Sequence, residues 1–67
     1  MKIERTTERG YEVKEETISN ALSILNKDLE EERQIWINNR PFMKKMILAE
    51  DLSETDKISI TNKLVGG

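Results

Sequence analysis

The chain contains neither cysteine nor histidine. Their absence excludes disulfides, thiolate nucleophiles, imidazole bases and the usual zinc ligands. Proline occurs once, glycine three times, and the aromatic residues are one Trp, one Tyr and one Phe. At 67 residues the chain makes one domain, near the smallest size that folds without a covalent or metal staple. Its core must therefore come from aliphatic packing.

An excess of charge of one sign and a long apolar run are also missing. Lys and Arg total 11 and Asp and Glu total 13, so we expect no nucleic-acid partner. No apolar stretch reaches the roughly 20 residues that span a bilayer, and the charged start lacks the apolar centre of a secretory signal. We expect a cytoplasmic protein with no membrane partner. Because so short a chain rarely encloses a catalytic cleft, we also expect a non-enzyme.

The first third of the sequence predicts a β-hairpin. Residues 2–6 form a strand candidate, and residues 6–10 form a turn in which Gly10 takes positive φ. Tyr11 and Val13 then alternate with charged residues, which is typical of a half-buried strand. We therefore expect Val13 in the core.

A helix follows this hairpin. Thr17 is a suitable N-cap, and the apolar residues after it recur at three- and four-residue spacing. Asn26 is a candidate left-handed closing residue. The acidic run Glu30–Glu32 is unfavourable at the negative end of a helix, so the helix is predicted to end near Asn26. Leu29 would then pack on the core from a loop.

The clearest strand comprises residues 34–38, and a turn follows at residues 38–41. Trp36 is predicted to lie on the face opposite the core. Two interpretations of this indole stay open. It contacts a partner protein, since aromatic residues are enriched at interface hot spots, or it is covered by Phe42 or Met43.

Residues 42–51 fit no single period, so a short helical turn and an irregular strand both agree with the pattern. The Met43 and Met46 pair is typical of core filling. A last strand is predicted at residues 57–62. Residues 63–67 are too short and too rich in glycine to form an element, and are expected to be a flexible tail.

This element order predicts an α+β fold for a domain of residues 1–62. The order is ββαββ, with one main helix that packs its apolar stripe on a mixed sheet in two layers. The predicted core residues are Ile3, Val13, Ile18, Leu22, Leu25, Ile35, Ile37, Ile58 and Ile60.

Several segments together resemble the ubiquitin-like sulfur-carrier family of ThiS and MoaD. Met1–Ile3 is similar to the opening strand of that family, and Ile35–Phe42 is similar to its strand with an Asn-Gly type turn. Leu64–Gly67 is similar to its shared Gly-Gly end, and the chain length is closer to ThiS. Asn39 and Thr55 stand where the family has glycine. Asn tolerates positive φ, but a β-branched Thr resists it, so a different turn type is expected at Thr55.

The resemblance implies a β-grasp fold in which the first and last strands are central neighbours. It also implies a function for the C-terminus. A ubiquitin-activating-like adenylyltransferase of the ThiF/MoeB type would use ATP to adenylate the carboxylate of Gly67. The resulting thiocarboxylate would pass sulfur to a biosynthetic synthase. A thiazole synthase of thiamine biosynthesis is the favoured acceptor, and the molybdopterin pathway is the next choice.

Other residues of the tail receive roles from the same resemblance. Gly66 lacks a Cβ and would thread a narrow channel of the partner. Leu64 and Val65 would contact the partner, as would Trp36, although both tail residues are equally suited to packing on the core as the last part of a strand. The chain itself would hold no cofactor and no metal, and would be monomeric when free.

Two other functions agree with the sequence. A ubiquitin-like modifier would use the same adenylation to join Gly67 to lysines of target proteins. A small protein-binding domain would carry its terminal glycines incidentally.

Overall fold

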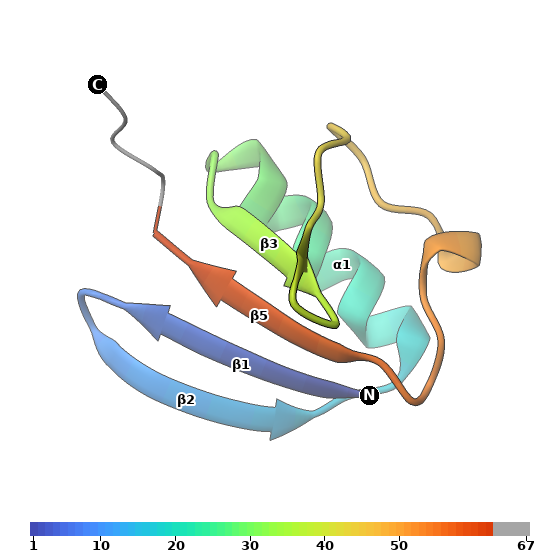
Figure 1. The fold of residues 1–67 in the computed structure, drawn as a ribbon, viewed down its shortest axis with the longest axis horizontal. Coiled ribbons are helices and arrows are strands. Elements are labelled where there is room, and N and C mark those ends of the chain that lie inside the picture. The colour runs from blue at the N-terminus through green and yellow to red at the C-terminus, as the bar shows by residue number, and fades with distance from the viewer. Residues whose placement is uncertain (63–67) are drawn as a thin grey trace.

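The computed structural model describes residues 1–62 of the chain. They form one α-helix and a five-stranded mixed sheet (Figure 1), as the predicted α+β class requires. Two short elements, β4 and a single turn of 3₁₀ helix (η1), extend the predicted ββαββ order. The elements are β1 Lys2–Thr7, β2 Gly10–Glu15, α1 Ile18–Glu30, β3 Gln34–Ile37, β4 Arg40–Pro41, η1 Ala49–Asp51 and β5 Lys57–Thr61.

The strands are ordered β2-β1-β5-β3-β4 across the sheet. β1 and β5 run parallel, whereas β1–β2, β5–β3 and β3–β4 are antiparallel. The first and last strands are therefore central neighbours, as the resemblance implied. Parallel neighbours need a long crossover connection, which here comprises everything between Thr7 and Lys57. β5, the last strand of the described residues, completes the sheet by pairing between β1 and β3.

The core lies between α1 and one face of the sheet. Of the predicted core residues, Ile18, Leu22 and Ile37 are only partly buried at its border. Ile47 and Leu52 come from the segment that showed no clear period. The buried apolar residues are Ile3, Ala21, Leu25, Ile35, Ile47, Leu52, Ile58 and Ile60.

The prediction that Val13 is a core residue is wrong, because 41% of its surface is exposed. The turn between β1 and β2 contains only Glu8 and Arg9, and its register places Ile3 opposite Lys14. Residues opposite each other in a sheet share a face, and successive residues alternate between faces. Because Ile3 points into the core, Lys14 lies on the helix side of β2. Val13 lies on the outer face, opposite Glu4.

Backbone conformations at the turns agree with the sequence. Gly10 has φ +119°, and Asn38 and Asn39 have φ +50° and +66°. Two consecutive left-handed residues form the tight hairpin turn that suits the twist of adjacent strands. Thr55 is not among the described residues with positive φ, so its turn is of a different type, as expected.

The helix begins as predicted but ends later. Oγ1 of Thr17 accepts a hydrogen bond from the N–H of Asn20 at 3.2 Å. α1 then continues one turn past the predicted end, to Glu30, so that partly buried Leu29 packs from the helix and not from a loop. The acidic run does not extend the helix further, since Glu32 turns the chain with φ +62°.

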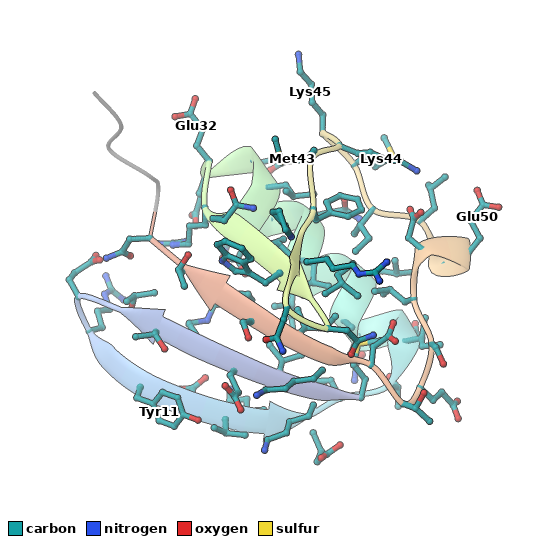
Figure 2. All side chains as sticks on the ribbon, in the orientation of Figure 1. Tyr11, Glu32, Met43, Lys44, Lys45 and Glu50 are labelled. Atoms are coloured by element: carbon teal, nitrogen blue, oxygen red, sulfur yellow. The ribbon has the colours of Figure 1, made fainter. Side chains whose placement is uncertain are left out.

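Asn26 anchors a distant loop and does not close the helix. Its Oδ1 accepts from the N–H of Ile47 at 2.9 Å, and its Nδ2 donates to the carbonyl of Ile47 at 3.1 Å. This pair of hydrogen bonds holds the Ile47 side chain in the core. The neighbouring Met43 and Met46 point outward, and 82% of Met43 is exposed (Figure 2). The interpretation of the two methionines as core filling is wrong.

Candidate functional site

Most of the predicted site lies outside the described residues 1–62. This applies to Gly66 and Gly67, the predicted acyl donor, and to the predicted contact residues Leu64 and Val65. The structure does describe Trp36 and the strand that leads into this segment. We call this region the exit end of the sheet, and define it by Glu8, Gln34, Trp36, Thr61 and Asn62.

Trp36 lies on the outer face of the exit end. It sits opposite Ser59 of β5, and its Nε1 donates a long hydrogen bond of 3.4 Å to Oγ1 of Thr61. Phe42 does not cover it. The N–H of Phe42 donates to the carbonyl of Ile35 at 2.8 Å, and its ring packs against the core on the other face. The indole remains partly exposed, and its use as a partner contact stays a prediction.

Glu8 stands at the tip of the β1–β2 hairpin, near Asn62. A hydrogen bond from its own backbone N–H, with a weaker one from the side chain of Asn62, holds the pKa of Glu8 below its usual value. Thr61 is also the β5 residue opposite Thr6 of β1 and Gln34 of β3. The last described residues are therefore held from both sides of β5.

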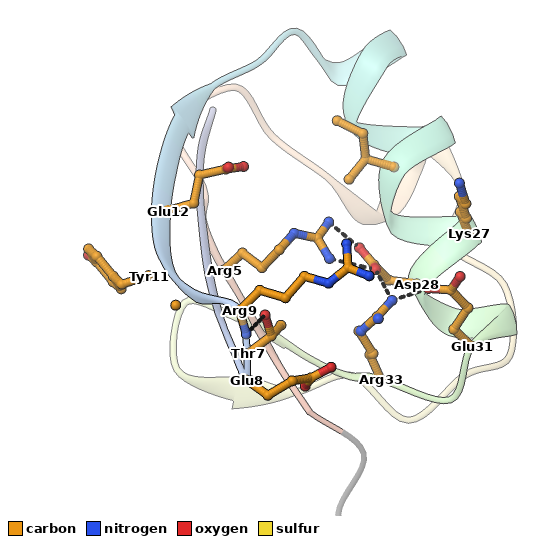
Figure 3. Close-up of a pocket in the computed structure, with 12 residues that line it drawn as sticks. Arg5, Thr7, Glu8, Arg9, Tyr11, Glu12, Lys27, Asp28, Glu31 and Arg33 are labelled. Carbon is orange, nitrogen blue, oxygen red and sulfur yellow. Dashed lines mark hydrogen bonds and ion pairs between the residues drawn. The ribbon is translucent and has the colours of Figure 1, made fainter.

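An open cleft of about 580 Å³ lies between this hairpin and the end of α1 (Figure 3). Asp28 of α1 lies at its floor with only 3% of its surface exposed. Arg5 of β1 contacts this carboxylate with both terminal nitrogens, at 2.8 Å and 2.7 Å. Arg33 donates to it at 3.1 Å and also pairs with Glu31. The cluster joins β1 to both ends of the turn after α1.

The ion pairs stabilise the charged forms of both arginines. The hydrogen bond to Asp28 raises the pKa of Arg5 above its ordinary value, although burial acts in the opposite direction. The pKa of Arg33 is raised chiefly by its hydrogen bond to Glu31. Four basic side chains and four carboxylates line the cleft, so it carries no net charge that would select a small ion. Its charged residues are Arg5, Arg9, Lys27, Arg33, Glu8, Glu12, Asp28 and Glu31.

Sequence reasoning missed this cluster, although the sequence contains a signal for it. Asp28 follows Ala21 and Leu25 at the same three- and four-residue spacing that defines the apolar stripe. Arg5 shares a face of β1 with Ile3. A carboxylate on the stripe and a guanidinium on the facing strand together indicate a buried ion pair, since buried charges need partners.

Neither a metal centre nor a membrane-spanning helix is found in the part of the chain that is described. Residues 1–62 contain no group of three or more acidic side chains placed to hold a metal ion. α1, their one α-helix, is too short and too polar to cross a bilayer. No family model matches the chain, and comparisons with curated proteins and with solved structures found no match.

Proposed function

We propose that this chain is a β-grasp sulfur carrier and that the carboxylate of Gly67 is its working group. The observation that carries the proposal is the position of β5. This strand is the middle one of the sheet, it is paired with β1 and β3, and it leads directly into the Gly-Gly end of the sequence. The predicted acyl donor thus follows a strand that is paired on both sides, which gives a partner enzyme a rigid body to hold.

The reaction needs no ionisable side chain of the carrier. A carboxylate oxygen of Gly67 attacks the α-phosphorus of ATP, and pyrophosphate leaves. A hydrosulfide ion then attacks the carbonyl carbon of the acyl-adenylate, the bond from this carbon to the AMP oxygen breaks, AMP leaves, and the product is the thiocarboxylate after loss of a proton. The partner ATPase, of the ThiF/MoeB type, supplies the catalytic groups. Gly66 matters because a residue without Cβ lets the backbone approach the nucleotide closely.

Contacts with the partner would come from the exit end and the segment after it. Trp36 offers a partly exposed indole there, and Leu64 and Val65 offer apolar side chains. The product thiocarboxylate suits a thiazole synthase of thiamine biosynthesis, with molybdopterin synthesis as the next candidate. The carrier itself would hold no cofactor, because its chemistry is confined to the chain end.

The experiment is ATP–pyrophosphate exchange with ThiF/MoeB-type enzymes, together with intact mass spectrometry after a sulfur source is added. Deleting Gly67, or changing Gly66→Trp, is expected to abolish exchange while circular dichroism stays unchanged. The control Lys44→Ala is expected to retain exchange, apart from a salt-dependent effect on docking. Full exchange by a chain that lacks Gly67 would overturn the proposal. Exchange without replacement of oxygen by sulfur in the intact mass would favour the modifier instead.

A further inference from the structure

β2 is an exposed edge strand that keeps regular pairing geometry along its whole length. All six of its residues, Gly10–Glu15, are exposed, and it is the end strand of the described sheet (Figure 1). Natural edges are blocked by proline, by a bulge, by being very short or by charged side chains, and β2 carries only the last of these, in Glu12, Lys14 and Glu15. The opposite edge follows this rule, because β4 has only two residues and one is Pro41. β2 contains no proline and keeps an unbroken register with β1.

The hydrogen-bond pattern shows which backbone groups of this edge point outward. The N–H of Glu16 donates to the carbonyl of Met1 at 2.8 Å, so even-numbered residues of this stretch point their backbone groups toward β1. In an antiparallel ladder these groups alternate in direction along the strand. The N–H and C=O groups of Tyr11, Val13 and Glu15 therefore point away from the sheet.

We propose that a second copy of the chain binds this edge, with the two β2 strands antiparallel about a two-fold axis at Val13. The outward backbone groups of Val13 would bond those of Val13 in the second copy. Tyr11 and Glu15 would bond each other across the interface in the same way. The two sheets would join into one continuous sheet, and the interface is isologous, as closed dimers require.

The charges of β2 favour this register over the registers one residue to either side. A two-fold axis at Glu12 would place two Glu12 carboxylates opposite each other. An axis at Lys14 would oppose two lysines and would set Glu12 against Glu16. An axis at Val13 instead places Glu12 opposite Lys14 of the second copy, twice. Opposite charges directly across two strands stabilise a pair and like charges destabilise it, so the Val13 register is favoured.

The side chains concerned are exposed and make only weak ion pairs within the chain, Glu12 with Lys14 and Glu15 with the N-terminal ammonium of Met1 at 3.5 Å. Glu12 and Lys14 lie on the helix side of β2, where their mutual contact of 3.4 Å joins two exposed groups. Exposed pairs of this kind are weak, so both side chains can turn to a second copy at little cost. On the outer face the two Val13 side chains would cover each other, and Tyr11 would lie beside Glu15. Figure 2 shows Tyr11 projecting from this edge.

This dimer would replace the expected monomer and is independent of the proposed function. β2 is separated from β5 by β1, so pairing at the β2 edge leaves the exit end uncovered at Trp36 and Thr61. Loss of the dimer would not affect adenylation of Gly67. Loss of adenylation, in turn, would leave the dimer intact, so the two proposals fail separately.

The test is sedimentation equilibrium of the full chain over a wide concentration range. Glu12→Lys and Lys14→Glu each create like-charge pairs, and each variant alone is expected to weaken the dimer at least about tenfold. Mixed together, the two variants place lysines opposite glutamates, and a heterodimer is expected to form. The double variant E12K/K14E is expected to dimerise as the original chain does.

A second pair of variants tests the backbone contact. Val13→Pro removes an outward N–H that makes no bond to β1, so the domain is expected to fold as a monomer. The matched control Val13→Thr keeps the N–H and is expected to dimerise. The proposal is overturned if the original chain is monomeric at all concentrations. It is equally overturned if the two charge variants dimerise alone, or if their mixture does not pair.

Discussion

Asp28 is the buried charged residue of the described structure, and its two arginine partners determine what it contributes. Arg5 binds both carboxylate oxygens, and Arg33 shares one of them. Removing one partner of such a cluster leaves a charge without compensation, which costs more than the cluster contributed in total. The arginines are partly exposed, so solvent reduces this cost.

Asp28→Asn tests this contribution because it removes the charge and keeps the volume. We expect the free energy of unfolding to fall by about 2–4 kcal/mol in urea denaturation. Glu50→Gln is the control, since Glu50 is exposed (Figure 2) and its replacement is expected to leave stability unchanged. If both variants unfold at the same urea concentration, the cluster contributes nothing to stability.

The side chain of Asn26 makes hydrogen bonds to the backbone N–H and C=O of Ile47. A substitution at Asn26 measures what these two bonds contribute to stability. Asn26→Leu leaves the buried N–H and C=O of Ile47 without partners, at a cost of about 1–3 kcal/mol. The local readout is amide hydrogen exchange, which is expected to accelerate at Ile47 more than at Ile58 of β5. Asn26→Asp keeps the acceptor alone and is expected to give an intermediate effect. Unchanged protection at Ile47 would contradict this role.

Asp51 makes the stability of the folded domain depend on pH in the acidic range. Its Oδ2 accepts from the N–H of Leu48 at 2.9 Å, and this hydrogen bond, helped by Lys44, lowers the pKa of Asp51. A carboxyl group with a lowered pKa in the folded state stabilises the fold above its unfolded pKa. That stabilisation is lost as the pH falls through the folded value.

Thermal unfolding between about pH 5 and pH 2 measures this effect. The original chain is expected to lose more stability over this range than Asp51→Asn, because the amide does not titrate. Parallel pH profiles for the two proteins would show that Asp51 makes no such contribution.

At the scale of elements, local patterns predicted the four longer strands and the start of the helix. They did not predict the strand registers, the end of the helix or the short strand β4, which lies within the predicted turn at residues 38–41. The alternation around Tyr11 and Val13 indicated a strand, but not which face would be buried. A shift of one residue exchanges the faces, and a turn assigned to residues 6–10 does not fix the register. The two-residue turn at Glu8 and Arg9 does.

A pair of alanine substitutions checks the resulting assignment of faces. Leu25 of α1 is fully buried, so Leu25→Ala is expected to cost about 2–5 kcal/mol. Val13→Ala removes a side chain on the exposed outer face and is expected to cost about 0.5 kcal/mol or less. Chemical denaturation of both variants gives the comparison. Equal losses would mean that β2 buries Val13 after all.

The structure of residues 42–51, after β4, could not be predicted from local sequence because distant residues hold this segment in place. Ile47 is buried through hydrogen bonds to Asn26, which lies 21 positions earlier, and the methionines beside it face solvent. Such a segment has no period of its own, so no local pattern distinguishes its buried residue. The arginine cluster was missed for a related reason, since its partners Arg5 and Asp28 are 23 positions apart.

At the scale of the whole molecule, the sheet order could not be derived from periodicity. The adjacency of β1 and β5 joins residues from the two ends of the described chain, as in the pair Lys2 and Lys57. Only the resemblance to sulfur carriers predicted it. The predicted site at Gly66 and Gly67 likewise came from a pattern at the chain end, and its chemistry remains a proposal.

The parallel pairing of β1 and β5 also determines how the domain responds to force. β1 starts beside Lys57 and β5 ends beside Thr6, so the start of one strand and the end of the other lie at opposite ends of the pair (Figure 1). Tension applied at Met1 and Asn62 therefore slides the strands along each other. Their hydrogen bonds are loaded together in shear, and do not open one after another as in a peeled hairpin. A pull on Asn62 against a fixed Met1 therefore acts in the direction in which the hydrogen bonds between β1 and β5 resist together.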